Sequence, residues 1–190
     1  MSASVLYMSM SLDGYIADPD DRLGGDDGTR LHHWALNPDR ESFRTDGPAG
    51  QFVDEINATG AVLVGRRTAE VVDHWGSTHH GVPIFVVSHR PPGPTVADYP
   101  LVTYVADGIA SAMAQAKAAA GDSNVLVHGA YTAQRALEAS VLDELQIHQI
   151  PVLLGSGRRL FEGLPARVEL AIVRVIDTPD ATHIRYRVRR

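Results

Sequence analysis

The stretch AVLVGRRTAE, residues 61–70, decides the fold and points toward the functional site. Its first four residues are apolar and mostly β-branched or small, which predicts a buried strand. Gly65 ends that strand, and Arg66, Arg67 and Thr68 follow at the start of an expected helix. Glycine lets the backbone approach a ligand closely, and the first amides of a helix favour negative charge. We therefore expect this turn to hold a phosphate.

Segments on either side of this stretch alternate between strand and helix patterns. The strands are expected at 4–12, 61–64, 82–88, 101–105, 124–130 and 144–155. The helices are expected at 50–60, 68–75, 108–120 and 132–141. For the helix at 108–120, Asp107 is the expected N-cap and Gly121 the expected end. Segments 167–176 and 182–190 read as an antiparallel hairpin. This order predicts an α/β fold with a mostly parallel sheet and the hairpin at its edge.

Length and composition limit the classes of function. The 190 residues suit one domain spanning 1–190, with 44% hydrophobic and 21% charged residues and no cysteine. A net charge of -6 argues against general nucleic-acid binding. No apolar run reaches the roughly 18 residues that a membrane span needs, and the N-terminus lacks a signal-peptide pattern. We expect a cytoplasmic protein.

Two further strand exits carry groups that suit an anion. Ser88, His89 and Arg90 follow one buried strand, and His128 with Gly129 follows another. The second exit continues into a helix start through Ala130, Tyr131 and Thr132. Ligands of open α/β sheets sit beyond the carboxyl ends of the strands. Three such exits on neighbouring strands fit a dinucleotide, although the glycine fingerprint of classical dinucleotide-binding folds is missing.

Several segments together resemble a known family. They are SMSLDGYIA (9–17), LHHW (31–34), VLVGRRTAE (62–70), IFVVSHR (84–90) and the long run from VLVHGAYTAQ to GRRLFEGL (125–164). In order and spacing the chain resembles the dihydrofolate-reductase-like superfamily, most closely the reductase domain of riboflavin biosynthesis. The resemblance implies a three-layer dihydrofolate-reductase-like fold and a reductase that uses NADPH.

The resemblance also implies which residues contact NADPH. It assigns the phosphates to Gly65, Arg66, Arg67 and Thr68, the adenosine 2′-phosphate to Ser88, His89 and Arg90, the pyrophosphate and nicotinamide to Gly129, Ala130, Tyr131 and Thr132, and further contacts to Ile16, Ala17 and Gly155. An arginine near the adenosine ribose favours NADPH over NADH, in agreement with the charge pattern.

The chain departs from the family pattern at the proposed catalytic positions. His128 stands where the family has a glycine; it is either a proton donor or a hydrogen-bond partner. Asp54 and Glu55 do not match the spacing of the acid that protonates a pterin, so folate reduction is not implied. Asp13 is a candidate for proton transfer, but its favoured role is to cap the turn with Gly14.

The loop at 18–50 is expected to cover a substrate, with His32 and Trp34 as candidate contacts; Trp34 either walls a pocket or anchors the loop. The remaining histidines, including His74, His79 and His80, are interpreted as surface residues of loops. We expect no metal site, because a specific site needs three or four converging ligands.

Alternating basic residues close the chain. His183, Arg185, Arg187 and Arg189 are interpreted as the charged outer face of an edge strand, and a homodimer through this hairpin is expected. The sequence thus predicts an NADPH-dependent reductase acting on a small heteroaromatic or carbonyl substrate of pyrimidine or pterin type. The alternative is a non-catalytic NADP-binding or dimeric regulatory module with the same fold.

Overall fold

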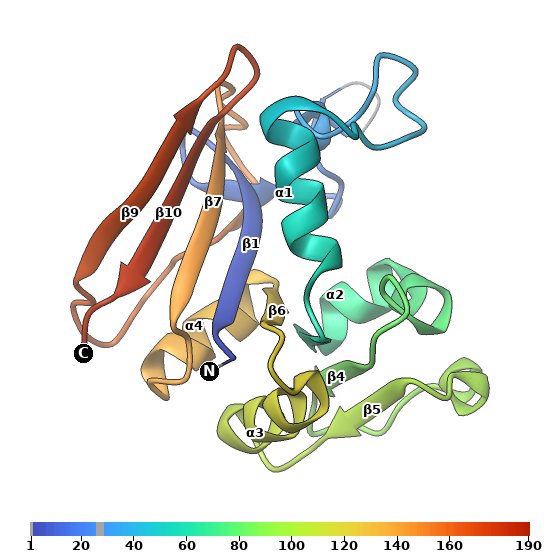
Figure 1. Cartoon of the computed structure of the whole chain (residues 1–190). Coiled ribbons are helices and arrows are strands. Elements are labelled where there is room, and N and C mark those ends of the chain that lie inside the picture. Colours follow the sequence, from blue (N-terminus) through green and yellow to red (C-terminus); the bar gives the residue numbers. More distant parts are fainter. Residues whose placement is uncertain (1, 26–28) are drawn as a thin grey trace.

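The structure, a computed structural model, describes residues 2–25 and 29–190. Within these residues one sheet of eight strands forms the centre of the molecule, in the order β5-β4-β3-β6-β1-β7-β10-β9 (Figure 1). The strands are β1 (Ser4–Ser11), β3 (Ala61–Gly65), β4 (Ile84–Val87), β5 (Val102–Val105), β6 (Val125–His128), β7 (Glu144–Ile150), β9 (Leu170–Asp177) and β10 (Thr182–Val188). The pairs from β5 to β7 are parallel, whereas β10 runs antiparallel to both β7 and β9. The predicted α/β fold with its C-terminal hairpin at one edge is confirmed.

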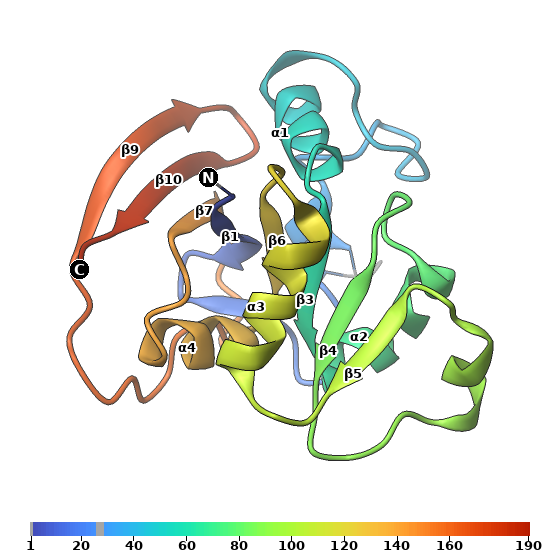
Figure 2. The same cartoon turned by 60° about the horizontal axis from the view of Figure 1, so that its bottom comes forward.

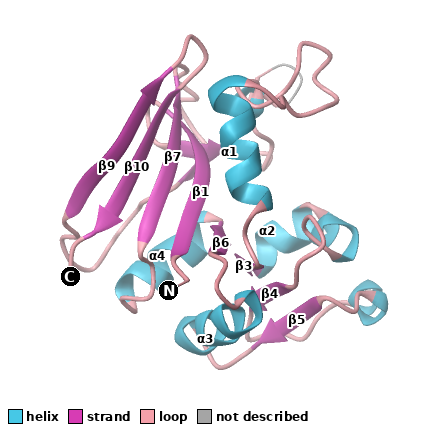
Figure 3. Ribbon diagram, viewed as in Figure 1, coloured by secondary structure: helices cyan, strands magenta, loops and turns pink. Residues whose placement is uncertain are grey.

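Helices cover both faces of the sheet (Figures 2 and 3). They are α1 (Gly47–Asn57), α2 (Arg66–Val71), α3 (Ile109–Ala120) and α4 (Ala130–Glu138), with short 3-10 turns at Arg30–His32, Asp73–Ser77 and Pro94–Asp98. Leu6 and Leu63 pack with α3 and α4 on one face. Val5 and Val64 pack with α2 on the other, because successive side chains of a strand point to opposite faces. Three layers result.

A second, small sheet pairs β2 (Tyr15–Ala17) with β8 (Arg158–Arg159). The sequence predicted an N-terminal strand at 4–12 and did not indicate this pairing. Gly157, with φ +128, lets the chain pass close to β2: a Cβ there would stand 2.0 Å from the Ala17 carbonyl oxygen. A side chain at residue 157 would therefore separate the two strands.

Two predictions about local structure are wrong. The N-cap of α3 is Gly108 and not Asp107, and no side chain caps that helix. β10 is not the edge strand, because it lies inside the sheet between β7 and β9. Of the basic stripe, Arg187 and Arg189 are exposed as expected, whereas His183 and Arg185 are not. His183 is 1% exposed, and Arg185 pairs with Glu55 of α1 and Glu144 of β7. The alternation of basic and apolar residues was recognised correctly, but α1 covers the side of β10 at His183 and Arg185, which was expected to face solvent.

Within residues 2–25 and 29–190, no helix is both long enough and apolar enough to cross a membrane.

Candidate functional site

The three strand exits predicted to hold an anion meet in one cleft. They follow β4, β3 and β6, which are neighbours in the sheet and parallel, so their carboxyl ends share one edge. The cleft has a volume of about 1130 Å³. Of the predicted site residues, it is lined by Ile16, Ala17, His32, Trp34, Gly65, Arg66, Arg67, Thr68, Ser88, His89, Arg90, His128, Gly129, Ala130, Tyr131 and Thr132.

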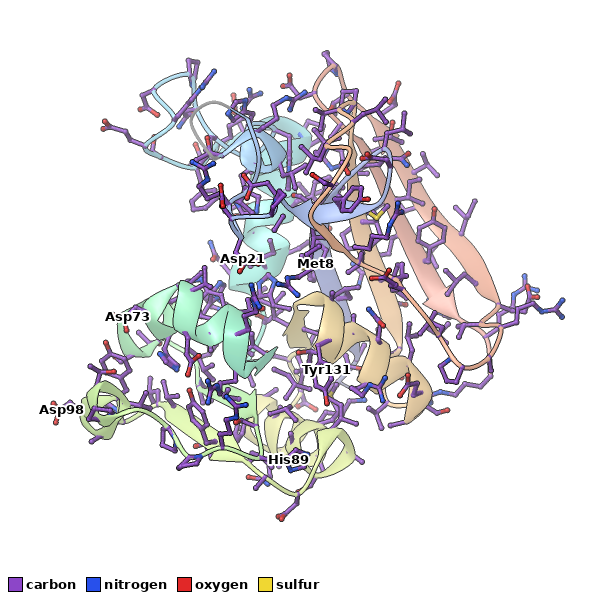
Figure 4. The ribbon with its side chains drawn as sticks, turned by 180° about the vertical axis from the view of Figure 1, so that it is seen from behind. Met8, Asp21, Asp73, His89, Asp98 and Tyr131 are labelled. Carbon is purple, nitrogen blue, oxygen red and sulfur yellow. The ribbon has the colours of Figure 1, made fainter. Side chains whose placement is uncertain are left out.

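The cleft also receives groups from the N-terminal segments. Figure 4 labels Met8 of β1, Asp21 of the loop after β2 and Tyr131 of α4, and all three line the cleft. Tyr131 is 60% exposed at the mouth. The loop that begins at residue 18 thus borders the cleft, as the sequence predicted; its residues 26–28 lie outside the described part of the chain.

Two glycines leave room beside two threonine hydroxyls. A Cβ at Gly129, where φ is +90, would stand 2.7 Å from Thr68 Oγ1, and a Cβ at Gly65 would stand 3.0 Å from Thr132 Oγ1. Thr132 is 1% exposed, and its Oγ1 has no hydrogen-bond partner among the described residues. A buried hydroxyl is normally hydrogen-bonded, so this atom marks a place for a polar ligand. The absence of both Cβ atoms gives that ligand room to approach.

The arginines at the mouth are neutralised by carboxylates in this state. Arg66 pairs with Glu70 one turn along α2, at 3.1 Å. Asp21 accepts hydrogen bonds from Arg67 and, at 2.9 Å, from Arg158. Partial burial acts to raise the pKa of Asp21, but the hydrogen bonds from both arginines outweigh it and lower the pKa. Asp21 therefore stays ionised between two guanidinium groups, a contact that the sequence did not predict.

The exit of β4 forms a compact turn. Ser88 Oγ donates to the Arg90 carbonyl at 2.8 Å and accepts from the Arg90 amide at 3.0 Å. Within the described residues the Arg90 guanidinium forms no ion pair, and the residue is exposed. Arg90 thus differs from the arginines of α2, because its charge is available to an anion without displacing a carboxylate.

Asp13 and Gly155 are the two predicted site residues that do not line this cleft. The Asp13 carboxylate accepts hydrogen bonds from the Ser11 hydroxyl at 2.6 Å and from the amides of Leu154 and Gly155 at 3.1 and 2.8 Å. These bonds, led by that from Ser11, lower the pKa of Asp13 to about 2. These contacts favour the turn-stabilising role of Asp13 over the proposed proton transfer, because a carboxyl group with so low a pKa holds no proton to donate at neutral pH.

Histidines line the other end of the cleft. Six of the nine in the chain border it: His32, His79, His80, His89, His128 and His148. The His79 and His80 rings approach through their Nδ1 atoms, and the His128 ring lies 5.9 Å from that of His79. Burial lowers the pKa of His128 to about 3, with the neighbouring His79 acting in the same direction. Burial also lowers the pKa values of His32 and His79 to about 4.

The interpretation as a surface loop residue is wrong for His74, which is 3% exposed with its Nε2 2.9 Å from Tyr104 Oη. His80 is exposed in a loop, as expected, and its Nε2 lies 3.2 Å from Thr59 Oγ1. Both His32 and His79 border the cleft. Among the described residues no group of three histidine or acidic side chains has the arrangement of a metal site.

A left-handed turn places Trp75 beside these histidines. Residues 73–77 have φ between 44° and 93°, which non-glycine residues rarely adopt and which costs roughly 1 kcal/mol or more per residue. Trp75 reaches the cleft from this turn, and its ring lies 5.7 Å from that of His128 at an angle of 31°. Strained backbone of this kind gathers at functional sites, so this turn supports the assignment of the cleft.

Trp34 combines the two roles that the sequence left open. It lines the cleft, and it also anchors the loop: its Nε1 donates to Ser9 Oγ at 2.9 Å, and its ring stacks 4.0 Å from that of His148. His148 Nδ1 in turn lies 2.6 Å from His183 Nδ1 beneath α1. Burial and the nearby His183 and Arg174 keep the pKa of His148 well below its usual value.

Comparison with known proteins assigns a family to this arrangement. The family model described as the RibD C-terminal domain matches residues 4–184. The chain belongs to the RibD C-terminal domain family. An uncharacterised protein, YwjB, of Bacillus subtilis is 26% identical over 174 residues, which are 89% of this chain and 88% of that protein. The resemblance stated from the sequence is thus confirmed.

Solved structures of this family share the fold. A structure described as a putative riboflavin biosynthesis protein from Shewanella sp. PV-4 superposes with a TM-score of 0.78 at 25% identity, covering 99% of each chain. The diaminohydroxyphosphoribosylaminopyrimidine deaminase/5-amino-6-(5-phosphoribosylamino)uracil reductase of Thermotoga maritima gives a TM-score of 0.65 at 15% identity. The match covers 98% of this chain and 56% of that one.

Proposed function

We propose that this protein is an NADPH-dependent reductase of small heteroaromatic substrates, of pyrimidine or pterin type. One observation carries the proposal: the carboxyl ends of β3, β4 and β6 open into a single cleft with a buried, unpartnered hydroxyl at Thr132. Family membership supports the reductase class. A dinucleotide needs several anion contacts in a row, and these three exits supply them.

The residues present fit a phosphorylated dinucleotide. Thr68 and Thr132 offer hydroxyls where Gly65 and Gly129 leave space, and the first amides of α4 have no capping side chain. Arg90 offers a guanidinium for the phosphate that distinguishes NADPH from NADH. When bound, the nicotinamide would supply a hydride, and the protein would supply binding, orientation and exclusion of water.

The substrate would lie on the histidine side of the cleft. There His128 and Trp75 form a wall beside the place expected for the nicotinamide. The neutral imidazole of His128 offers a ring nitrogen to the substrate. We assign His128 the role of orienting the substrate by a hydrogen bond.

Calorimetric titration tests the cofactor assignment. We expect NADPH to bind more tightly than NADH, and Arg90→Ala to weaken NADPH by roughly tenfold while leaving NADH nearly unchanged, because a charge-assisted hydrogen bond contributes about 1.5–3 kcal/mol. Arg167→Ala is the matched control, since Arg167 is exposed in the segment before β9. An absence of binding heat with both cofactors would refute the proposal.

A second candidate is a nucleotide-binding module without turnover. The lowered pKa of His128 favours it, because an imidazole that is neutral at pH 7 is not a ready proton donor. The two candidates are separated by following NADPH oxidation by absorbance with a panel of pterins, aminopyrimidines and quinones. Tight NADPH binding without oxidation by any of them would favour the module.

We also propose a homodimer formed through β9. This strand is the edge of the sheet, so one side of its backbone is unpaired, and Ile172, Val173 and Val175 are 67, 45 and 54% exposed. A long apolar edge strand pairs readily with a second copy of itself.

A further inference from the structure

The cleft has two chemically different ends. The end near β3 and β4 carries the arginines, whereas the other end is built from rings and apolar side chains. The residues of this second end, which we term the aromatic end, are His32, Trp34, Val53, Ile56, Trp75, His79 and His128, all of which line the cleft. They come from the loop after β2, α1, the turn after α2 and β6.

The aromatic end offers no positive charge to a ligand. Among the described residues that line the cleft, the guanidinium groups of Arg22, Arg66, Arg67 and Arg158 each pair with a carboxylate. Arg90 belongs to the exit of β4, where the cofactor phosphate is assigned. The histidines of the aromatic end are held neutral by burial and by one another. A phosphate placed there would be desolvated without a partner, which is costly.

The same end is well suited to a flat, neutral ring. Trp75 and His128 lie within 31° of parallel with centroids 5.7 Å apart, and both residues line the cleft. Neutral imidazole is both a donor and an acceptor, so His128 and His79 match the alternating donors and acceptors of a pyrimidine edge. Val53 and Ile56 of α1 add apolar side chains to the same end of the cleft as the polar His128 and His79. Such a mixture of apolar surface and a few polar groups is typical of small-molecule sites.

We propose that the aromatic end binds an uncharged, planar pyrimidine-like ring that carries no phosphate. This proposal rests on the proposed function, since the other end of the cleft is taken to hold the cofactor. The description of the Thermotoga maritima relative names a phosphoribosylamino substrate for that protein. The present chain would differ from that relative in the charge of the compound that it accepts.

The tryptophans allow a direct test. The chain contains two, Trp34 and Trp75, and both line the cleft, so quenching of intrinsic fluorescence reports occupancy. Uridine and uridine 5′-monophosphate would be titrated into the NADP⁺-saturated protein, followed by thymidine and its 5′-monophosphate, with excitation at the red edge of tryptophan absorption. We expect each nucleoside to bind at least tenfold more tightly than its monophosphate.

A charge-insertion variant makes the test sharper. Asn57 lines the cleft at the end of α1 and is exposed, so Asn57→Lys adds a cation without disturbing the core. We expect this variant to bind the monophosphates at least fivefold more tightly and the nucleosides unchanged, whereas Asn57→Gln, the matched control, behaves as the wild type. Equal or tighter binding of monophosphates by the wild type would overturn the proposal, as would the absence of quenching by any nucleoside at millimolar concentration.

The two proposals can fail separately. Nucleoside binding to a protein that binds no NADPH would refute the cofactor assignment and support the uncharged-ligand site, provided that the titration is repeated without NADP⁺. NADPH binding with a preference for monophosphates would refute the uncharged-ligand site alone.

Discussion

Asp21 neutralises two arginines beside the cleft. Its carboxylate lies between Arg67 and Arg158, and its own backbone has φ of 61°, which L-residues seldom adopt. A cofactor phosphate that used Arg67 would have to displace this carboxylate. The proposed cofactor would therefore compete with Asp21 for the same guanidinium groups.

Removing that competitor should strengthen binding. We expect Asp21→Asn to lower the dissociation constant of NADPH by roughly threefold to tenfold, because a charge-assisted contact to a phosphate contributes on the order of 1 kcal/mol at an exposed site. Asp20→Asn is the control, since Asp20 pairs with Arg22 instead. Weaker binding by Asp21→Asn, measured by calorimetry, would show that Asp21 organises the site.

At the scale of elements, α1 is fastened to the C-terminal hairpin by one carboxylate. Glu55 accepts hydrogen bonds from Arg174 of β9 at 2.7 and 2.9 Å, and Arg185 of β10 lies 3.4 Å away. The side chains of these three residues are 16–28% exposed, so solvent screens the contacts only in part. Arg174 also covers the ring of Phe52. The hairpin thereby fixes the helix that forms one wall of the aromatic end.

Glu55→Gln should loosen this attachment. We expect the free energy of unfolding, measured by urea denaturation, to fall by about 2 kcal/mol, since the bonds lost involve charged groups. Asp54→Asn, which neutralises an exposed carboxylate of the same helix, serves as the control. A change below about 0.5 kcal/mol for Glu55→Gln would mean that the ion pairs are offset by their desolvation.

The His148–His183 pair links β7 and β10 beneath the same helix and makes stability depend on pH. Burial, with help from Arg174, lowers the pKa of His183 to about 4, against 6.5 for a free histidine. Between pH 4 and pH 6.5, His183 is therefore mostly protonated in the unfolded chain and mostly neutral in the folded chain. The free energy of unfolding should therefore be highest above pH 6.5 and fall as the pH drops toward 4.

The variant His183→Gln should flatten this dependence. We expect the loss of stability between pH 7 and pH 5 to shrink by roughly 1–2 kcal/mol, as measured by urea denaturation at both pH values. The exposed His89→Gln is the control. An unchanged slope in His183→Gln would show that His183 is not the group responsible.

At the scale of the whole molecule, β9 presents an apolar edge to solvent. Ile172 is 67% exposed, and introducing a charge there should prevent a second copy from pairing. We expect a dimer by light scattering at tens of micromolar and a monomer for Ile172→Arg, with Leu12→Arg as a control at an exposed site in the turn after β1. A wild-type monomer at that concentration would contradict the proposed homodimer.

Much of the fold could be predicted because local pattern and burial agree. The run AVLV and its neighbours are buried strands, and the exits after β3, β4 and β6 do share one cleft. The contacts of Asp21 could not be predicted, because a long polar loop has no periodicity that fixes which aspartate faces Arg67. His183 was misplaced because the sequence shows alternation but not which face a distant helix covers. The turn that brings Trp75 to His128 has a left-handed backbone, and its sequence carries no pattern from which that conformation could be predicted.

The position of β1 has a consequence for how the chain is made. This strand, at the very start of the sequence, pairs with β6 and β7, more than 110 residues later. The apolar segment SVLYMSMS therefore leaves the ribosome long before either neighbour has been synthesised, and its pairing must wait until residues 125–150 have emerged. A nascent chain stalled before residue 125 would expose that segment to chaperones.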